Sequence, residues 1–124
     1  MKVLPAMLCS SLLTVLFVVS PVAHADQQLA ASMCDYIKAD DKNRFRKLLS
    51  DNRLRLRNIY DGIMCDGHPL VRFAVVSNAS GAGEFIIKQL PGNQVAQSGD
   101  LEWATSNGFA ASPILEAIKA RSAS

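Results

Sequence analysis

The first 25 residues constrain this chain most, because they carry the pattern of a cleavable secretory signal peptide. Lys2 gives a positive start, residues 7–19 are almost wholly apolar, and Ala23-His24-Ala25 places small residues where signal peptidase cuts. The apolar run of about 13 residues is shorter than the roughly 20 that a transmembrane helix needs. The sequence therefore predicts a signal peptide over residues 1–25, with cleavage after Ala25.

Cleavage there would leave a single exported domain over residues 26–124, long enough to bury roughly 65% of its unfolded surface. Loss of Lys2 leaves 12 basic residues against 11 acidic ones. This near balance argues against nucleic acid as a partner. No second apolar run is long enough to span a membrane, so we expect no transmembrane segment after cleavage.

The cysteines form an even pair once the signal peptide is removed. Cys9 leaves with the peptide, and Cys34 and Cys65 remain. An even count in an oxidising compartment predicts one disulfide. Closing a loop of about 32 residues would stabilise the fold by roughly 3 to 4 kcal/mol. A redox pair is the alternative, but the two cysteines lack the C-x-x-C spacing.

Apolar residues after residue 26 recur mostly with helical spacing. We expect an all-α domain of five or six short helices, stacked as antiparallel pairs and joined by one disulfide. The expected helices cover residues 28–38, 42–50, 69–78 and 84–90, a short turn at 101–106, and a last helix that starts at Ser112-Pro113. Residues 80–83 are expected to form a loop, and residues 92–100 are expected to be irregular.

Residues 53–65 allow two interpretations. Alternation of arginine and leucine from Arg53 to Arg57 favours a strand. Leu56, Ile59 and Ile63 instead follow helical spacing and continue the apolar face of the preceding helix. The sequence favours a helix here, with the strand left open.

A basic stretch is the most uneven feature of the expected domain. Seven of the eight charged residues between Lys42 and Arg57 are basic. They are interpreted either as a solvated helix face, whose long side chains cover apolar surface, or as a surface for an anionic envelope component or an acidic protein patch. The candidate partner surface consists of Arg44, Arg46, Lys47, Arg53, Arg55 and Arg57.

Chemistry-bearing motifs are scarce. Cys65 and His68 lie three residues apart, and Cys34 would make a third potential zinc ligand. An oxidised cysteine neither binds zinc in this way nor attacks a substrate, so the disulfide interpretation removes both possibilities. The sequence therefore predicts no catalytic residue, no metal and no cofactor.

Three segments carry a resemblance. They are Cys34 followed by Asp40-Asp41, the run Arg-Leu-Arg-Leu-Arg-Asn-Ile-Tyr that ends at Tyr60, and Cys65-Asp-Gly before an apolar helix. On them, the chain resembles a family of small exported bacterial proteins of unknown function between Met33 and Leu90. The resemblance implies export, paired cysteines and a periplasmic location, with secretion as the alternative. A looser echo of ankyrin-type helix pairs joins the segments that begin near Pro69 and Pro113.

From these features we expect a non-enzymatic envelope protein that binds a partner. The alternative is a small-ligand-binding or stress-linked periplasmic protein with a pocket between its helices. A hydrolase is a remote third possibility. A large apolar pocket would favour the second hypothesis, and a flat basic face would favour the first.

Overall fold

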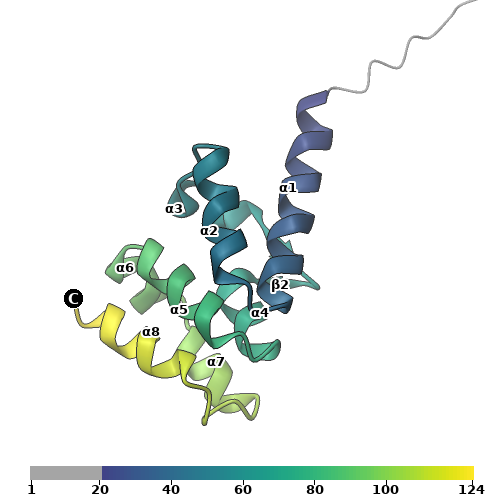
Figure 1. The fold of residues 1–124 in the computed structure, drawn as a ribbon. Coiled ribbons are helices and arrows are strands. Elements are labelled where there is room, and N and C mark those ends of the chain that lie inside the picture. Colours follow the sequence, from purple (N-terminus) through teal and green to yellow (C-terminus); the bar gives the residue numbers. More distant parts are fainter. Residues whose placement is uncertain (1–20) are drawn as a thin grey trace, which may run out of the picture.

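A computed structural model describes the backbone of residues 21–124 and the side chains from Gln27 onward (Figure 1). The positive start and the apolar run of the expected signal peptide therefore lie outside the described residues, as does Cys9. The first helix begins at Pro21, so the expected cleavage after Ala25 falls within its first turns.

Residues 21–124 form eight α-helices, one short 3-10 turn and a two-stranded antiparallel ribbon, which confirms the all-α class. The elements are α1 (Pro21–Lys38), α2 (Lys42–Asp51), α3 (Leu56–Ile59), η1 (Tyr60–Gly62), β1 (Met64–Cys65), β2 (His68–Pro69), α4 (Leu70–Val76), α5 (Ser80–Gln89), α6 (Gly92–Gln97), α7 (Asp100–Ser106) and α8 (Ile114–Ser122). Eight helices exceed the expected five or six because short helices form where loops were predicted.

Helix α5 begins at Ser80, where a loop was predicted, and this prediction was wrong. The carboxylate of Asp40 accepts a hydrogen bond from the backbone N–H of Ala82 at 2.8 Å, which satisfies one of the free donors at the helix start. Gly83 is needed inside this helix because a Cβ there would lie 2.6 Å from Cδ1 of Ile114. The two glycines that suggested a loop therefore permit close packing.

Helix α6 occupies part of the segment that was expected to be irregular. Only Val95 of this helix is buried, so its sequence has no apolar stripe. Gly92 lies against the end of α8, where a Cβ would come within 2.7 Å of the carbonyl oxygen of Arg121. The Arg121 guanidinium in turn donates to the carbonyl of Leu90 at 2.8 Å. Tertiary contacts thus stabilise a helix that local pattern does not predict.

The ambiguous segment 53–65 is partly helical and partly extended. Helix α3 and η1 cover Leu56 to Gly62, and Leu56 and Tyr60 are buried. Strand pairing occurs between β1 and β2 and not at the alternating arginines, of which Arg53 lies in a turn, Arg55 is extended and Arg57 belongs to α3. Pro69 ends that ribbon and precedes the first residue of α4.

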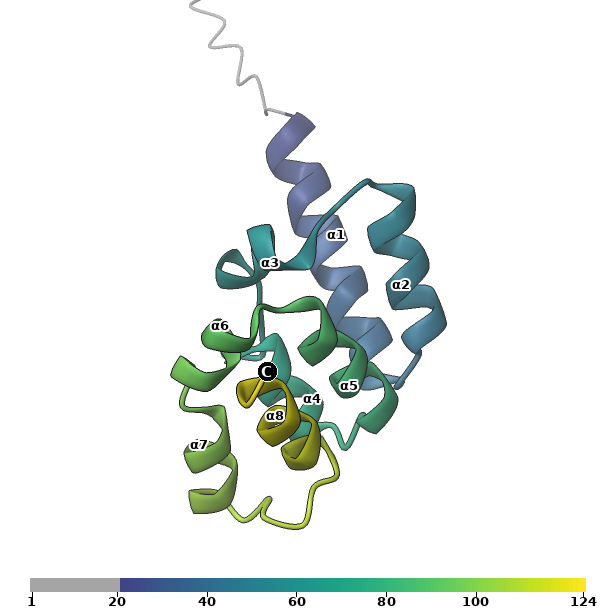
Figure 2. The same cartoon turned by 90° about the vertical axis from the view of Figure 1, so that its left-hand side faces the viewer.

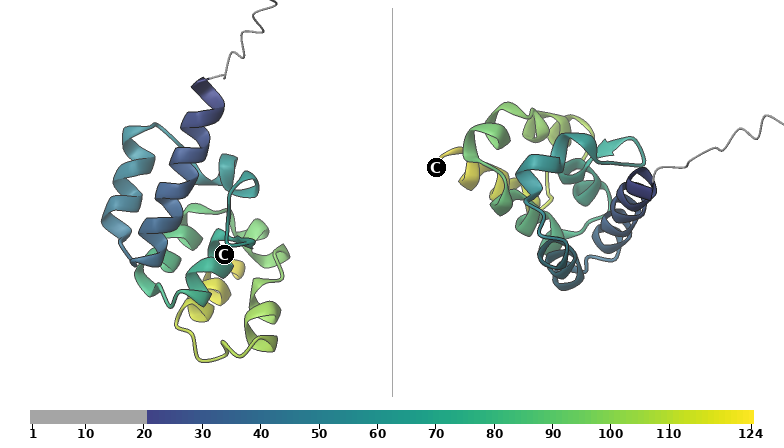
Figure 3. Two further views of the ribbon diagram at one scale, coloured as in Figure 1. Left: turned by 90° about the vertical axis from the view of Figure 1, so that its right-hand side faces the viewer. Right: turned by 90° about the horizontal axis from the view of Figure 1, so that it is seen from above.

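The helices surround one apolar core. Helices α1 and α2 lie side by side as an antiparallel pair (Figure 3), while α4, α5 and α8 pack together beside them. Helices α6 and α7 pack against α8 at one end of the molecule (Figure 2). The largest fully buried side chains are Phe45, Met33, Ile37, Leu70, Ile86, Ile87, Ile114, Ile118 and Val71. No helix within residues 21–124 combines the length and the apolar character that crossing a bilayer requires.

Candidate functional site: a basic segment beside an apolar pocket

The predicted disulfide is present. Cys34 on α1 and Cys65 on β1 are joined, with their Cα atoms 5.6 Å apart. The bond fixes α1 to the segment that follows α3 and η1. Both sulfurs are therefore engaged, and neither is free to act as a nucleophile or a metal ligand.

The basic residues of α2 are engaged by neighbouring side chains. Nε of Arg44 lies 3.4 Å from Oδ2 of Asp41, and Nζ of Lys47 lies 3.0 Å from Oδ2 of Asp51. Arg46 lies over the ring of Phe85, with its guanidinium carbon 5.3 Å from the ring centre. Exposed pairs of this kind contribute at most about 1 kcal/mol each. They nevertheless partly neutralise α2, as the interpretation of a solvated face expects.

Arg53, Arg55 and Arg57, which we call the arginine segment, differ from α2. All three side chains are exposed. The ion pairs among the described residues use other basic residues, so no described carboxylate lies within 4.0 Å of these three guanidinium groups. The structure thus separates the six candidate residues into a partly compensated helix, in which Arg46 has an aromatic neighbour and no carboxylate within 4.0 Å, and an arginine segment with neither kind of neighbour among the described residues.

Arg53 also has an unusual backbone. Its φ is 53°, in the left-handed region. The other non-glycine residues with positive φ are Asp or Asn, which adopt this region more readily than arginine does. The N–H groups of Arg53 and Leu54 donate to the carbonyls of Ser50 and Leu49 at 3.1 and 2.9 Å, which closes the end of α2. The arginine segment therefore starts from a fixed turn.

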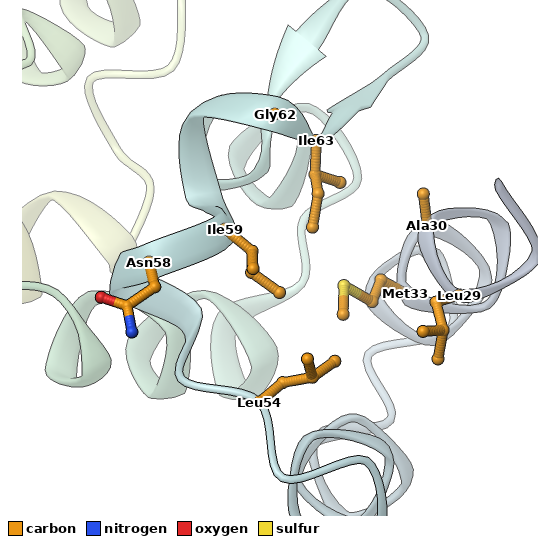
Figure 4. A pocket seen from close by; sticks show the side chains of 8 residues that line it. All are labelled: Leu29, Ala30, Met33, Leu54, Asn58, Ile59, Gly62 and Ile63. Atoms are coloured by element: carbon orange, nitrogen blue, oxygen red, sulfur yellow. The ribbon is translucent and has the colours of Figure 1, made fainter. Parts of the chain in front are cut away.

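A pocket of about 330 Å³ lies next to this segment, between α1 and the chain from Leu54 to Ile63 (Figure 4). We call it the α1–α3 pocket. It is lined by Leu29, Ala30, Met33, Leu54, Asn58, Ile59, Gly62 and Ile63. Leu54, Ile59 and Met33 point toward one another, whereas Asn58 lies at the edge (Figure 4). Asn58 is the only polar side chain of the lining, and the other lining side chains are apolar, while polar atoms still make up a substantial part of the exposed pocket surface.

A second pocket of about 310 Å³ contains the most buried charge of the described residues. Oδ1 of Asp100 accepts a hydrogen bond from Nε of Arg72 at 2.7 Å, and the Asp100 side chain is 6% exposed. Arg72 lies over Trp103, with its guanidinium carbon 5.1 Å from the ring centre. The sequence reasoning missed this pair because Asp100 and Arg72 are 28 residues apart.

Tyr60 borders the second pocket and belongs to the core. Its hydroxyl oxygen accepts the backbone N–H of Val71 at 3.2 Å, near the start of α4. Burial raises the pKa of the Tyr60 phenol well above its usual value, so the group is neutral at physiological pH. His68 lies edge-on to Trp103, with ring centres 5.6 Å apart. Among the described residues, no three His, Cys, Asp or Glu side chains gather as metal ligands would.

Comparison with known proteins identifies one relationship. A family model described as Protein of unknown function (DUF3718) matches residues 33–97, more than half of the chain. The chain belongs to this family. No curated protein and no solved structure matches it. Membership of a family of unknown function is confirmed, and the match begins at Met33, where the resemblance was expected to begin.

The DUF3718 match includes Cys34 and Cys65 and the whole arginine segment. It also includes the pocket wall from Leu54 to Ile63. Leu29 and Ala30 of the α1–α3 pocket precede the match, and Asp100 of the second pocket follows it. The disulfide, the arginine segment and most of the α1–α3 pocket are therefore features of the DUF3718 part of the chain.

Proposed function

We propose that this chain is an exported, non-enzymatic protein that binds an anionic component of the cell envelope through the arginine segment. The observation that carries the proposal is the difference between the two halves of the basic stretch. Acidic or aromatic neighbours engage Arg44, Arg46 and Lys47, whereas the arginine segment is exposed and has no described carboxylate within 4.0 Å. An exposed cluster of uncompensated charge attracts an anionic surface although the net charge of the chain is small.

The backbone of Arg53 supports the same proposal. A left-handed conformation costs a residue other than glycine, asparagine or aspartate roughly 1 to 2 kcal/mol. The Arg53 side chain makes no hydrogen bond or ion pair among the described residues that would offset this cost. A role of the guanidinium in binding accounts for an arginine at this position.

The expected size of the effect follows from the charge. Each arginine near an anionic surface contributes about 1 kcal/mol at moderate ionic strength. Neutralising three arginines should therefore weaken binding by about 3 kcal/mol, which is roughly a hundredfold. Because the Debye length falls to about 3 Å at 1 M salt, high salt should produce a similar loss.

The test measures sedimentation of the protein with vesicles of phosphatidylglycerol and phosphatidylcholine, compared with vesicles of phosphatidylcholine alone. The variant changes Arg53, Arg55 and Arg57 to Gln. The control changes Lys38, Lys88 and Lys119 to Gln, which removes the same charge from exposed positions elsewhere. We expect binding only to the anionic vesicles, lost in the arginine variant and retained in the lysine control. Equal loss in both variants, or equal binding to both kinds of vesicle, contradicts the proposal.

Export is tested separately. Expression of the full chain in a bacterium, followed by fractionation and N-terminal sequencing, should give a periplasmic protein that begins at Asp26. A cytoplasmic protein that retains Lys2 would refute the export part of the proposal and leave the binding part to the vesicle assay.

A further inference from the structure

We infer that the α1–α3 pocket binds the alkyl chain of a single-chain anionic amphiphile, such as a fatty carboxylate, and that the arginine segment holds its head group. The inference deepens the proposed function by naming the ligand. The assignment of the head group to the arginine segment rests on the proposed function. The assignment of the alkyl chain to the pocket does not, because side chains outside the arginine segment form the pocket.

The lining of the pocket matches an alkyl chain. Leu54, Ile59 and Met33 face one another across it, and no charged side chain contributes to the lining (Figure 4). A volume of about 330 Å³ lies at the lower end of the range for ligand pockets. At roughly 30 Å³ for each water-sized group, it accommodates about ten chain atoms. A chain of eight to ten carbons therefore fits this volume.

Two small residues create this space. Ala30 lines the pocket from α1, and Gly62 lines it from the end of η1. A Cβ added to Gly62 would meet no heavy atom within 4 Å, so the space beside Gly62 is open. Larger residues at either position would fill the pocket with protein atoms. The opening is thus a consequence of residue size at two positions.

The position of the arginines fixes the polar end of the ligand. Leu54 and Asn58 line the pocket, Arg53 and Arg55 flank Leu54 in the chain, and Arg57 precedes Asn58. Consecutive Cα atoms are about 3.8 Å apart, so the backbone of each arginine adjoins the pocket wall, although none of the three side chains lines the pocket itself. An apolar cavity bordered by uncompensated positive charge is complementary to a chain that ends in a negative group.

The main measurement is calorimetric titration of the oxidised protein, purified after export, with hexanoate, octanoate and decanoate below their micellar concentrations. Each additional buried methylene should tighten binding about fourfold, so each step of two carbons should give roughly a fifteenfold change until the pocket is full. Decanol has the same chain and no charge. It should bind more weakly than decanoate at low salt, and the difference should disappear at high salt.

The pocket is tested with a matched pair of variants. Ala30→Phe places a ring in the pocket, whereas Ala31→Phe makes the same change at the next residue, which is exposed and outside the lining. We expect decanoate binding to fall at least tenfold in Ala30→Phe and to stay unchanged in Ala31→Phe. Gly62→Leu, with Gly62→Ala as its control, provides a second test if Ala30→Phe does not fold. Equal decanoate affinity in the filled and control variants, or affinity independent of chain length, overturns the inference.

The two proposals fail in different ways. If vesicle binding requires the arginine segment but decanoate binding does not respond to Ala30→Phe, the pocket inference is wrong and the proposed function stands. If decanoate binding responds to Ala30→Phe but decanoate and decanol bind equally at low salt, the pocket binds chains and the head-group assignment is wrong.

Discussion

Removal of the Cys34–Cys65 bond should strongly destabilise the folded domain. The bond closes a loop whose ends are 31 residues apart in sequence. In the chain-entropy model, opening a loop of that length costs about 3.7 kcal/mol at 25 °C. Cys65 is buried, so replacing both cysteines by alanine also removes packing around one sulfur. We expect Cys34→Ala together with Cys65→Ala to lower the free energy of unfolding by about 4 kcal/mol.

Urea unfolding followed by circular dichroism measures this change. A domain of this size has a slope of roughly 1.5 kcal/mol per M urea, so the midpoint should fall by about 2.5 M. The wild-type protein in reductant is the natural control, because reduction breaks the bond and keeps both sulfurs. Its midpoint should fall nearly as far as that of the double variant.

A loss of less than about 1 kcal/mol would refute this reasoning, because it would mean that the unfolded chain gains little freedom when the loop opens. Mass spectrometry after alkylation without reductant identifies the cause. Labels on Cys34 and Cys65 of the wild-type protein would mean that the bond does not form, whereas no label at either position would mean that the entropy argument is wrong.

Two further predictions concern the core. Because burial raises the pKa of Tyr60 in the folded state, the unfolded chain releases the phenol proton first, so stability is full below about pH 10 and falls as the pH rises above it. Tyr60→Phe should reduce that alkaline slope in urea titrations, and an unchanged slope would contradict the assignment. Gly83→Ala should destabilise the protein by about 1 to 2 kcal/mol, since its Cβ would lie 2.6 Å from Cδ1 of Ile114. Gly62→Ala, which meets no atom within 4 Å, should differ little from the wild type in the same thermal melts.

The helices that the sequence predicts well are those with an apolar stripe of their own. Helix α2 has buried Phe45 and Leu49 four residues apart, with Asp41 as its cap. Its extent differs from the prediction by a single residue at the end. Local pattern is sufficient here because the cap and the buried face belong to the same short segment.

The helices that sequence reasoning missed depend on distant partners. The start of α5 is satisfied by Asp40, which is 42 residues from Ala82, and Gly83 is explained only by its contact with Ile114. Asp40 directly precedes Asp41, which caps α2, yet the side chain of Asp40 caps α5. A residue that can cap a helix can be recognised in a sequence, whereas the helix whose N–H donates to it depends on the fold.

Some features of the candidate site could likewise be predicted from the sequence, and others could not. The disulfide could be predicted from the even number of cysteines after residue 25 and from the expected oxidising compartment. Neutralisation of Lys47 by Asp51 could also have been found, since residues four apart in a helix lie side by side. The α1–α3 pocket could not be predicted, because a cavity depends on how well Leu29 and Leu54 approach each other across two elements. An apolar pattern predicts that residues are buried together and does not predict where space remains between them.

The disulfide connects the proposed location of the protein to the pocket that we infer. One pocket wall ends at Met33, directly before Cys34, and the other ends at Ile63, two residues before Cys65. The bond therefore joins the two walls where they come together. Without it, packing alone would hold the part of α1 that lines the pocket, from Leu29 to Met33, against the segment that ends at Ile63. The arginine segment, by contrast, starts from the closed end of α2 and does not depend on the bond. An oxidising compartment would thus be a condition for the shape of the pocket, while attraction to an anionic surface would persist in the reduced chain.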